Sequence, residues 1–159
     1  MSARRRLTTA VCLAAVGLTI AGSAIAGSTA RTTIRFIEVG GGPNDRFVDY
    51  ANNNRPDPGD VFMGTSALYR WDGIRRGARI GRAEIMCTIV SMSGAQCTGT
   101  FFFPAGKIVA VGFVRFGSGP AKVPVAGGTG RYVGARGVFT SRTIGTDNDV
   151  SADTITLLP

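Results

Sequence analysis

The chain has 159 residues, with 18 lysines and arginines against 10 aspartates and glutamates, and its formal charge is +8. It contains no histidine, which excludes His-containing catalytic triads, His-ligated zinc and histidine general bases. The basic residues are dispersed, and no basic stretch carries the interleaved aromatic side chains that favour nucleic-acid binding. The remaining candidates are functions that need neither histidine nor a nucleic-acid partner.

Residues 1–26 have the pattern of a secretory signal peptide. Residues 4–6 are arginines, residues 7–21 form an apolar run, and Ala-Ile-Ala at 24–26 is an A-x-A cleavage site. A retained membrane anchor is the alternative, but the Ala, Gly, Ser and Thr content of the run makes it a poor stop-transfer segment. We therefore expect a secreted, extracellular protein without stable membrane anchoring, in which residues 27–159 form a single domain.

Eight later segments are short, rich in β-branched and aromatic residues, and separated by turn residues, as is typical of strands. They are residues 31–39, 61–69, 78–91, 96–103, 107–116, 121–125, 137–144 and 150–158. No segment shows a helical period of 3.6 residues. The pattern predicts an all-β fold, an eight-stranded antiparallel barrel whose interior is just wide enough for one small ligand.

Residues 40–59, between the first two predicted strands, are rich in Gly, Pro, Asn and Asp. We predict a long loop in which residues 46–50 pack over the mouth of the barrel. The spacing of its Asp and Asn residues matches no EF-hand loop, so no metal site is predicted.

Glu38 is the notable residue of the first strand. Because side chains alternate along a strand, Glu38 shares a face with Ile34 and Phe36, which places a carboxylate among apolar side chains if that face looks inward. The alternative is that Ile37 and Val39 face inward and Glu38 is solvated, since acids are rarely buried unpaired. The residues alone leave both arrangements open and favour the second.

Two cysteines remain after removal of the signal peptide, Cys87 and Cys97, in a chain bound for an oxidising compartment. They flank a predicted hairpin turn near Met92, which brings their Cβ atoms within bonding range. The simplest interpretation is a disulfide, which would stabilise the fold by roughly 2 to 3 kcal/mol in the chain-entropy model.

The stretch from residue 124 to 138 is predicted to be a turn built on glycines that let Tyr132 fold back against the residues beneath it. The structural residues of this turn are Gly127, Gly128, Gly130, Tyr132, Gly134 and Gly137. Residues 128–133 begin like a dinucleotide-binding fingerprint, but a strand pattern follows at residue 138 where that fingerprint needs a helix. Phosphate binding is therefore not predicted.

The same stretch carries a family resemblance. Residues 125–132 and 135–137 resemble the signature turn shared by plant dirigent proteins and allene oxide cyclases, with further matches in the same order at residues 59–62, 68–69 and 81–83. Both families are small eight-stranded antiparallel barrels, so the resemblance implies that fold. It also implies a homo-oligomer, a trimer or a dimer, whose interface would cover the strands that are apolar on both faces.

The resemblance also assigns roles to individual residues. Both families place a pocket acid near the end of the first strand, which implies that Glu38 is the catalytic acid. Ser66, Tyr69 and Cys87 lie where pocket residues occur in these families, so they are implied to bind the ligand, and for Cys87 this competes with the disulfide. Allene oxide is not the implied substrate, because Gly40 and Ser66 stand where allene oxide cyclases carry asparagine.

Three functions remain open at this stage. The first is a secreted cyclase or isomerase that acts without a cofactor on a small apolar molecule held in the barrel. The second is a non-catalytic, lipocalin-like carrier of such a molecule. The third is a secreted interaction protein that uses its rim loops while side chains fill the barrel. The direction of Glu38 and the presence of an open cavity separate them.

Overall fold

The computed structural model describes residues 31–117, 119–145 and 149–159. The predicted signal peptide and its cleavage site lie outside these residues. In the described part of the chain, no helix has both the length and the apolar character needed to cross a bilayer.

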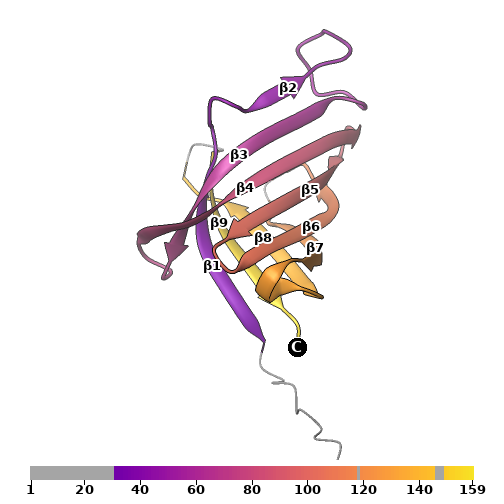
Figure 1. Ribbon diagram of the computed structural model, residues 1–159. Helices are drawn as coiled ribbons and strands as arrows, with labels where there is room; N and C mark the ends of the chain where they lie inside the picture. The colour runs from indigo at the N-terminus through magenta and orange to yellow at the C-terminus, as the bar shows by residue number, and fades with distance from the viewer. Residues whose placement is uncertain (1–30, 118, 146–148) are drawn as a thin grey trace, which may run out of the picture.

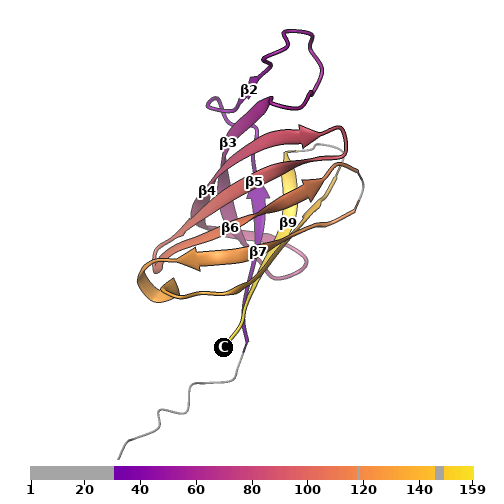
Figure 2. The ribbon, with the colours of Figure 1, turned by 90° about the vertical axis from the view of Figure 1, so that its right-hand side faces the viewer.

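The described residues form one antiparallel sheet that closes into a barrel (Figures 1 and 2). Its strands are β1 (Thr32–Val39), β2 (Arg46–Val48), β3 (Val61–Trp71), β4 (Arg76–Ser91), β5 (Gly94–Phe103), β6 (Gly106–Arg115), β7 (Ala121–Gly128), β8 (Gly137–Thr143) and β9 (Val150–Leu157). From β3 to β9 each strand pairs with the next, and β1 closes the barrel by pairing with both β9 and β3. The predicted eight-stranded antiparallel barrel is confirmed.

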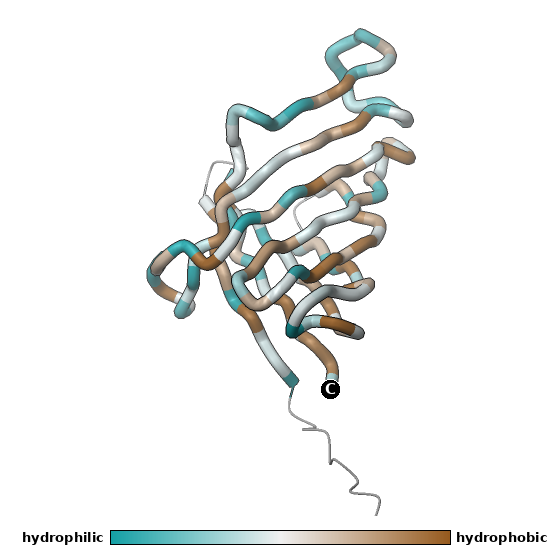
Figure 3. The backbone as a smooth tube through the Cα atoms, in the orientation of Figure 1, coloured by the Kyte–Doolittle hydropathy of each residue, from teal (hydrophilic) through white to brown (hydrophobic). Residues whose placement is uncertain are grey.

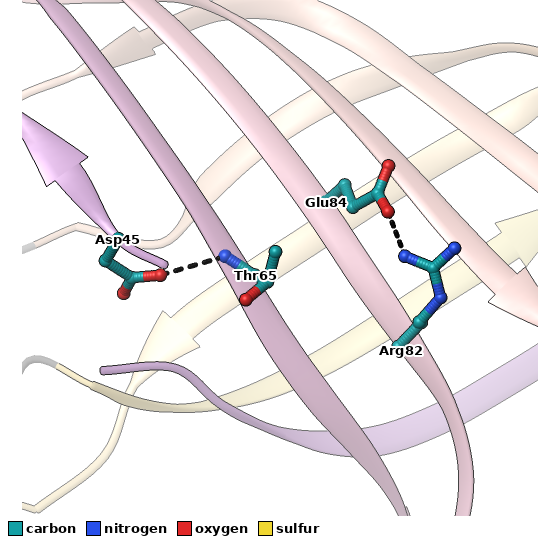
Figure 4. Close-up of polar contacts among 4 residues, drawn as sticks. All are labelled: Asp45, Thr65, Arg82 and Glu84. Carbon is teal, nitrogen blue, oxygen red and sulfur yellow. Dashed lines mark hydrogen bonds and ion pairs between the residues drawn. The ribbon is translucent and has the colours of Figure 1, made fainter. Parts of the chain in front are cut away.

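Strand β2 is an addition that the sequence did not predict. It lies within residues 40–59, which were expected to be a loop, and it pairs with residues 61–63 of β3, whereas β1 pairs with residues 67–70. In the gap between these two ladders, the Thr65 backbone N–H donates to the Asp45 carboxylate over 2.9 Å (Figure 4). Strand β2 and Asp45 therefore extend the barrel wall beyond the end of β1.

The remainder of the 40–59 segment is organised by another acid. The carboxylate of Asp60, which is 1% exposed, accepts the backbone N–H of Tyr50 over 2.9 Å and that of Asp57 over 2.8 Å. Figure 3 shows the hydrophilic character of this loop at the top of the molecule, in contrast to the apolar residues that recur along the barrel strands.

One half of the barrel interior is packed solid with apolar side chains. Phe36 of β1 and Phe101 of β5 have ring centroids 5.7 Å apart, and Phe101 and Phe139 are 4.7 Å apart. Leu68 and Ile108 are fully buried in the same cluster. Burial of this apolar area is the main source of stability for such a barrel.

The glycine-rich stretch closes the packed end. Its first part is strand rather than turn, because β7 continues to Gly128, and a short 3₁₀ helix, η1 (Gly130–Tyr132), follows. The Tyr132 ring packs edge-on against Phe103 with centroids 6.0 Å apart, as predicted. Gly130 has φ of +60°, and a Cβ atom there would lie 2.5 Å from the Ala105 carbonyl oxygen, so a larger residue would strain this turn.

The disulfide between Cys87 and Cys97 is present, as predicted. The two residues are directly opposite each other on β4 and β5, with Cα atoms 4.0 Å apart. This is the closely spaced kind of antiparallel pair, in which facing side chains approach most nearly.

Apolar side chains remain on the outer face of the barrel. Met86, Val90 and Phe113 are between 42% and 52% exposed. Phe102, also on the outer face, is covered by the Arg82 guanidinium 3.8 Å from its ring centroid. The expected homo-oligomer, whose interface would cover this face, stays a prediction.

Candidate functional site

A cavity of about 270 Å³ occupies the half of the barrel interior that the aromatic cluster does not fill. Its walls come from the C-terminal end of β1, from the N-terminal ends of β3, β7 and β9, and from β4, β5, β6 and β8. Most of the lining is apolar, and Phe62, Phe101, Val123 and Phe139 supply much of it. Polar side chains are gathered on one side, where β1, β8 and β9 lie next to one another.

Glu38 projects into this cavity. It follows Phe36 on the inward face of β1, and its register partner on β9 is Ser151, which lines the cavity with it. The alternative in which Glu38 is a solvated surface acid is therefore wrong. Its catalytic role stays a prediction.

Asp153 lies next to Glu38, and the sequence analysis did not identify it. It is fully buried, and it faces inward on β9 opposite Phe36. Neither of its carboxyl oxygens has a well-formed hydrogen bond with a described residue, although Glu38, Ser141 and Ser151 lie close enough to act on its pKa. The sequence carried a signal, because Asp153 continues the inward alternation that Ile155 and Leu157 begin.

The pKa of Asp153 is raised to about 9, first by burial and then by the neighbouring Glu38 carboxylate. Hydrogen bonding by the Ser141 and Ser151 hydroxyls acts the opposite way and is weaker. Asp153 therefore holds its proton at neutral pH. Two carboxyl groups that share a site in this way cannot both ionise easily, which is a common arrangement for moving a proton.

A second cavity of about 160 Å³ adjoins the first at the mouth of the barrel and shares Glu38, Phe62 and Ser151 with it. Asp45 and Asp149 line this mouth cavity. The Asp45 carboxylate accepts the backbone N–H of Gly41 over 3.1 Å as well as that of Thr65, so it fastens the chain after β1 to β3.

The side chain of Glu84 lies on the outer face of the barrel. Glu84 is one of the residues that border the main cavity, but it alternates with Ala83 and Ile85, whose side chains point into the barrel, and its carboxylate pairs with Arg82 on the outer face (Figure 4). Both side chains of this pair are 48% exposed. Among the described acids, Glu84 is thus a surface counterpart of Glu38 at a similar level of the barrel.

No protein-family model matches the chain, and no curated protein matches it in sequence. Solved structures do match. A pyocyanin demethylase has a TM-score of 0.66 and 20% identity, covering 79% of this chain and 99% of that one. A pterocarpan synthase dirigent protein has a TM-score of 0.66 and 18% identity, covering 82% and 86%. An exo-specific intermolecular Diels-Alderase has a TM-score of 0.64 and 17% identity, covering 80% and 98%.

The chain has the dirigent-type barrel fold. The resemblance drawn from the glycine-rich turn and the upstream motifs is thereby confirmed for the fold. Because these identities are low, the function of this dirigent-type barrel is argued from the residues of its cavity.

The three predicted ligand-binding residues fall in three different places in the dirigent-type barrel. Cys87 lines the main cavity together with Cys97, so the disulfide and a place in the cavity wall are compatible. Ser66 faces inward and lines the mouth cavity. Tyr69 is on the outer face, with the Arg76 guanidinium 4.7 Å from its ring centroid.

The placement of Tyr69 corrects the prediction that it lines the cavity. Leu68, the residue before it, is the one that points inward, and it is fully buried in the core. Ser66 and Tyr69 are three residues apart on one strand, and such residues face opposite sides of a sheet. The site of this dirigent-type barrel therefore contains Glu38, Asp153, Ser141 and Ser151 on one side and apolar walls on the other.

Proposed function

We propose that this protein is a secreted barrel that binds a small, largely apolar molecule and directs its cyclisation or isomerisation without a cofactor. The observation that carries the proposal is the cavity, in which apolar walls face Glu38, with the buried carboxyl group of Asp153 next to Glu38 behind the cavity lining. Support comes from the fold, which is shared with proteins described as a dirigent protein and a Diels-Alderase.

The apolar walls would act first. A flexible molecule confined among Phe62, Phe101 and Phe139 is held in few conformations, which brings reacting atoms together and excludes water. Glu38 would then accept or return one proton at the reacting centre. Asp153, which keeps its own proton at neutral pH, lies beside Glu38.

A matched pair of variants on β5 tests whether the cavity binds ligands. Gly99 lines the cavity, and a Cβ atom there meets nothing closer than 3.7 Å, so Gly99→Leu is expected to fill the cavity without disturbing the backbone. Thr100→Leu places the same side chain on the outer face. The neutral fluorophore N-phenyl-1-naphthylamine should brighten with the natural protein and with Thr100→Leu, and not with Gly99→Leu. Equal binding by both variants would place the binding site elsewhere.

Turnover is tested by looking for a product that has the same molecular mass as its substrate. A cyclisation or an isomerisation leaves molecular mass unchanged, so extracts of a strain lacking the protein are incubated with purified protein and examined for a compound that changes retention time at constant mass. We expect this conversion with the natural protein and with the surface control Asp72→Asn, at a fully exposed acid outside the cavities, and its loss with Glu38→Gln. Binding of the compound without any conversion by the natural protein would instead identify a carrier.

A further inference from the structure

The two adjoining cavities differ in charge from the molecule as a whole. The chain has an excess of lysine and arginine, yet within the described ranges no lysine or arginine lines either cavity. Acids line them instead: Glu38 is shared by both cavities, Asp45 and Asp149 lie at the mouth, and Glu84 borders the main cavity while its carboxylate pairs with Arg82 outside. A ligand that enters through the mouth therefore passes carboxylates from the rim to the interior.

Glu38 lies in the interior cavity, and among the described residues no cation pairs with its carboxylate. The one ion pair found among the described residues joins Arg82 and Glu84 on the outer face. Asp45 is already occupied by two backbone N–H groups. Beside Glu38, the fully buried carboxyl oxygens of Asp153 have no well-formed hydrogen bond with a described residue. A carboxylate in an apolar cavity without a cation is unfavourable, and a bound cation would remove that cost.

The rest of the cavity also suits a cation. Three phenylalanine rings, those of Phe62, Phe101 and Phe139, line the walls around Glu38. Aromatic faces attract ammonium groups, most strongly where water is excluded. The cavity thus offers one negative charge and several aromatic surfaces within a volume of about 270 Å³.

Resting on the proposed function, we infer that the ligand is a compact organic cation, an apolar body bearing one ammonium or iminium group, whose positive charge contacts Glu38. The apolar body would contact the apolar walls, and the positive charge would pair with the Glu38 carboxylate. A neutral molecule of the same shape would fill the walls and leave Glu38 without a partner.

Two isosteric probes separate charge from shape. Phenyltrimethylammonium and tert-butylbenzene differ in having nitrogen or carbon at the branched centre, and each is titrated against protein-bound N-phenyl-1-naphthylamine. The natural protein should release the fluorophore at lower concentrations of the cation. In Glu38→Gln the ratio of the two dissociation constants should move against the cation by at least about tenfold, the low end for close charge pairs. Asp72→Asn, which removes one negative charge at the fully exposed turn after β3, should leave the ratio within about twofold.

A preference of the natural protein for tert-butylbenzene would overturn the inference without any variant being needed. An unchanged ratio in Glu38→Gln, in protein that still binds the fluorophore, would also overturn it. In both cases displacement by the neutral probe leaves the proposed small-molecule barrel intact. Failure of the natural protein to bind the fluorophore or either probe would remove the proposed function and this inference together.

Discussion

The two halves of the barrel interior use the same strands for different purposes. Phe36 and Glu38 are two residues apart on β1 and face the same way, yet Phe36 is fully buried in the aromatic cluster and Glu38 borders an open cavity. The packed half, closed by Tyr132, stabilises the fold through apolar burial. The hollow half keeps two carboxyl groups together, and burying a carboxyl group there lowers the stability of the fold. Stability is therefore concentrated at one end of the barrel and chemistry at the other.

Truncating one phenylalanine in each half tests most directly whether stability is concentrated in the packed half. Phe36→Ala removes a fully buried ring and should lower the free energy of unfolding by about 3 to 5 kcal/mol. Phe62→Ala, at a ring that is 37% exposed beside the cavity, should cost about 1 kcal/mol or less, because the cavity already exists there. Urea unfolding measures both. Equal losses would show that the hollow half supports the fold as much as the packed half.

The disulfide tests how far the hollow half depends on covalent support. Replacing Cys87 and Cys97 together by serine should lower the free energy of unfolding by about 2 to 3 kcal/mol, because the unfolded chain gains freedom. Unfolding of the natural protein with and without reductant gives an independent measure. Two alkylatable thiols in native, oxidised material would contradict the bridge itself.

The smallest expected effect is on the way the free energy of unfolding depends on pH. The pKa of Asp153 rises from an ordinary value of 3.8 to about 9 on folding, so the folded protein retains a proton that the unfolded chain releases. Its contribution to stability is therefore complete below about pH 4 and is lost as the pH rises toward 9. Asp153→Asn should flatten this decline and raise the free energy of unfolding at pH 8 by a net of about 1 to 2 kcal/mol, because the cost of burying an unpaired amide offsets most of the several kcal/mol that the pKa shift implies.

Asp72 supplies the control for that measurement. Backbone N–H groups of Arg75 and Ile74 lower the pKa of Asp72, which is fully exposed, so its contribution is present at high pH and lost in acid. Asp72→Asn should leave the slope between pH 5 and pH 9 unchanged. An unaltered slope in Asp153→Asn would contradict the assignment of the decline to Asp153.

Much of the barrel was predictable because alternation and turn residues are local signals. The eight strands were placed within a few residues of their observed bounds. Strand β2 was missed because its three residues are held by pairing with β3, a contact that no local pattern records. The end of β7 is rich in glycine, which predicts a turn, but Gly128 lies within the strand, where a Cβ atom would meet the Lys107 carbonyl oxygen.

The site was less predictable. The inward direction of Glu38 came from the family resemblance, since the residues alone favoured a solvated acid. Asp153 was not predicted to be in the site because an acid among serines and threonines is typical of an exposed strand. Asp153 is two residues from Ile155, however, so the two side chains share the inward face. Tyr69 was misplaced because a motif match was given more weight than the alternation that separates it from Ser66.

The bond between Cys87 and Cys97 lies in the wall of the cavity, which gives it a second property besides its effect on unfolding. Thiol–disulfide exchange requires a thiolate to reach a sulfur atom, so the rate of reduction depends on access. A molecule seated in the cavity covers that approach from within. A bound ligand should therefore lengthen the half-life of the disulfide in a fixed concentration of reductant. Measuring this half-life reports how much of the protein is occupied, with no labelled ligand and no knowledge of the product.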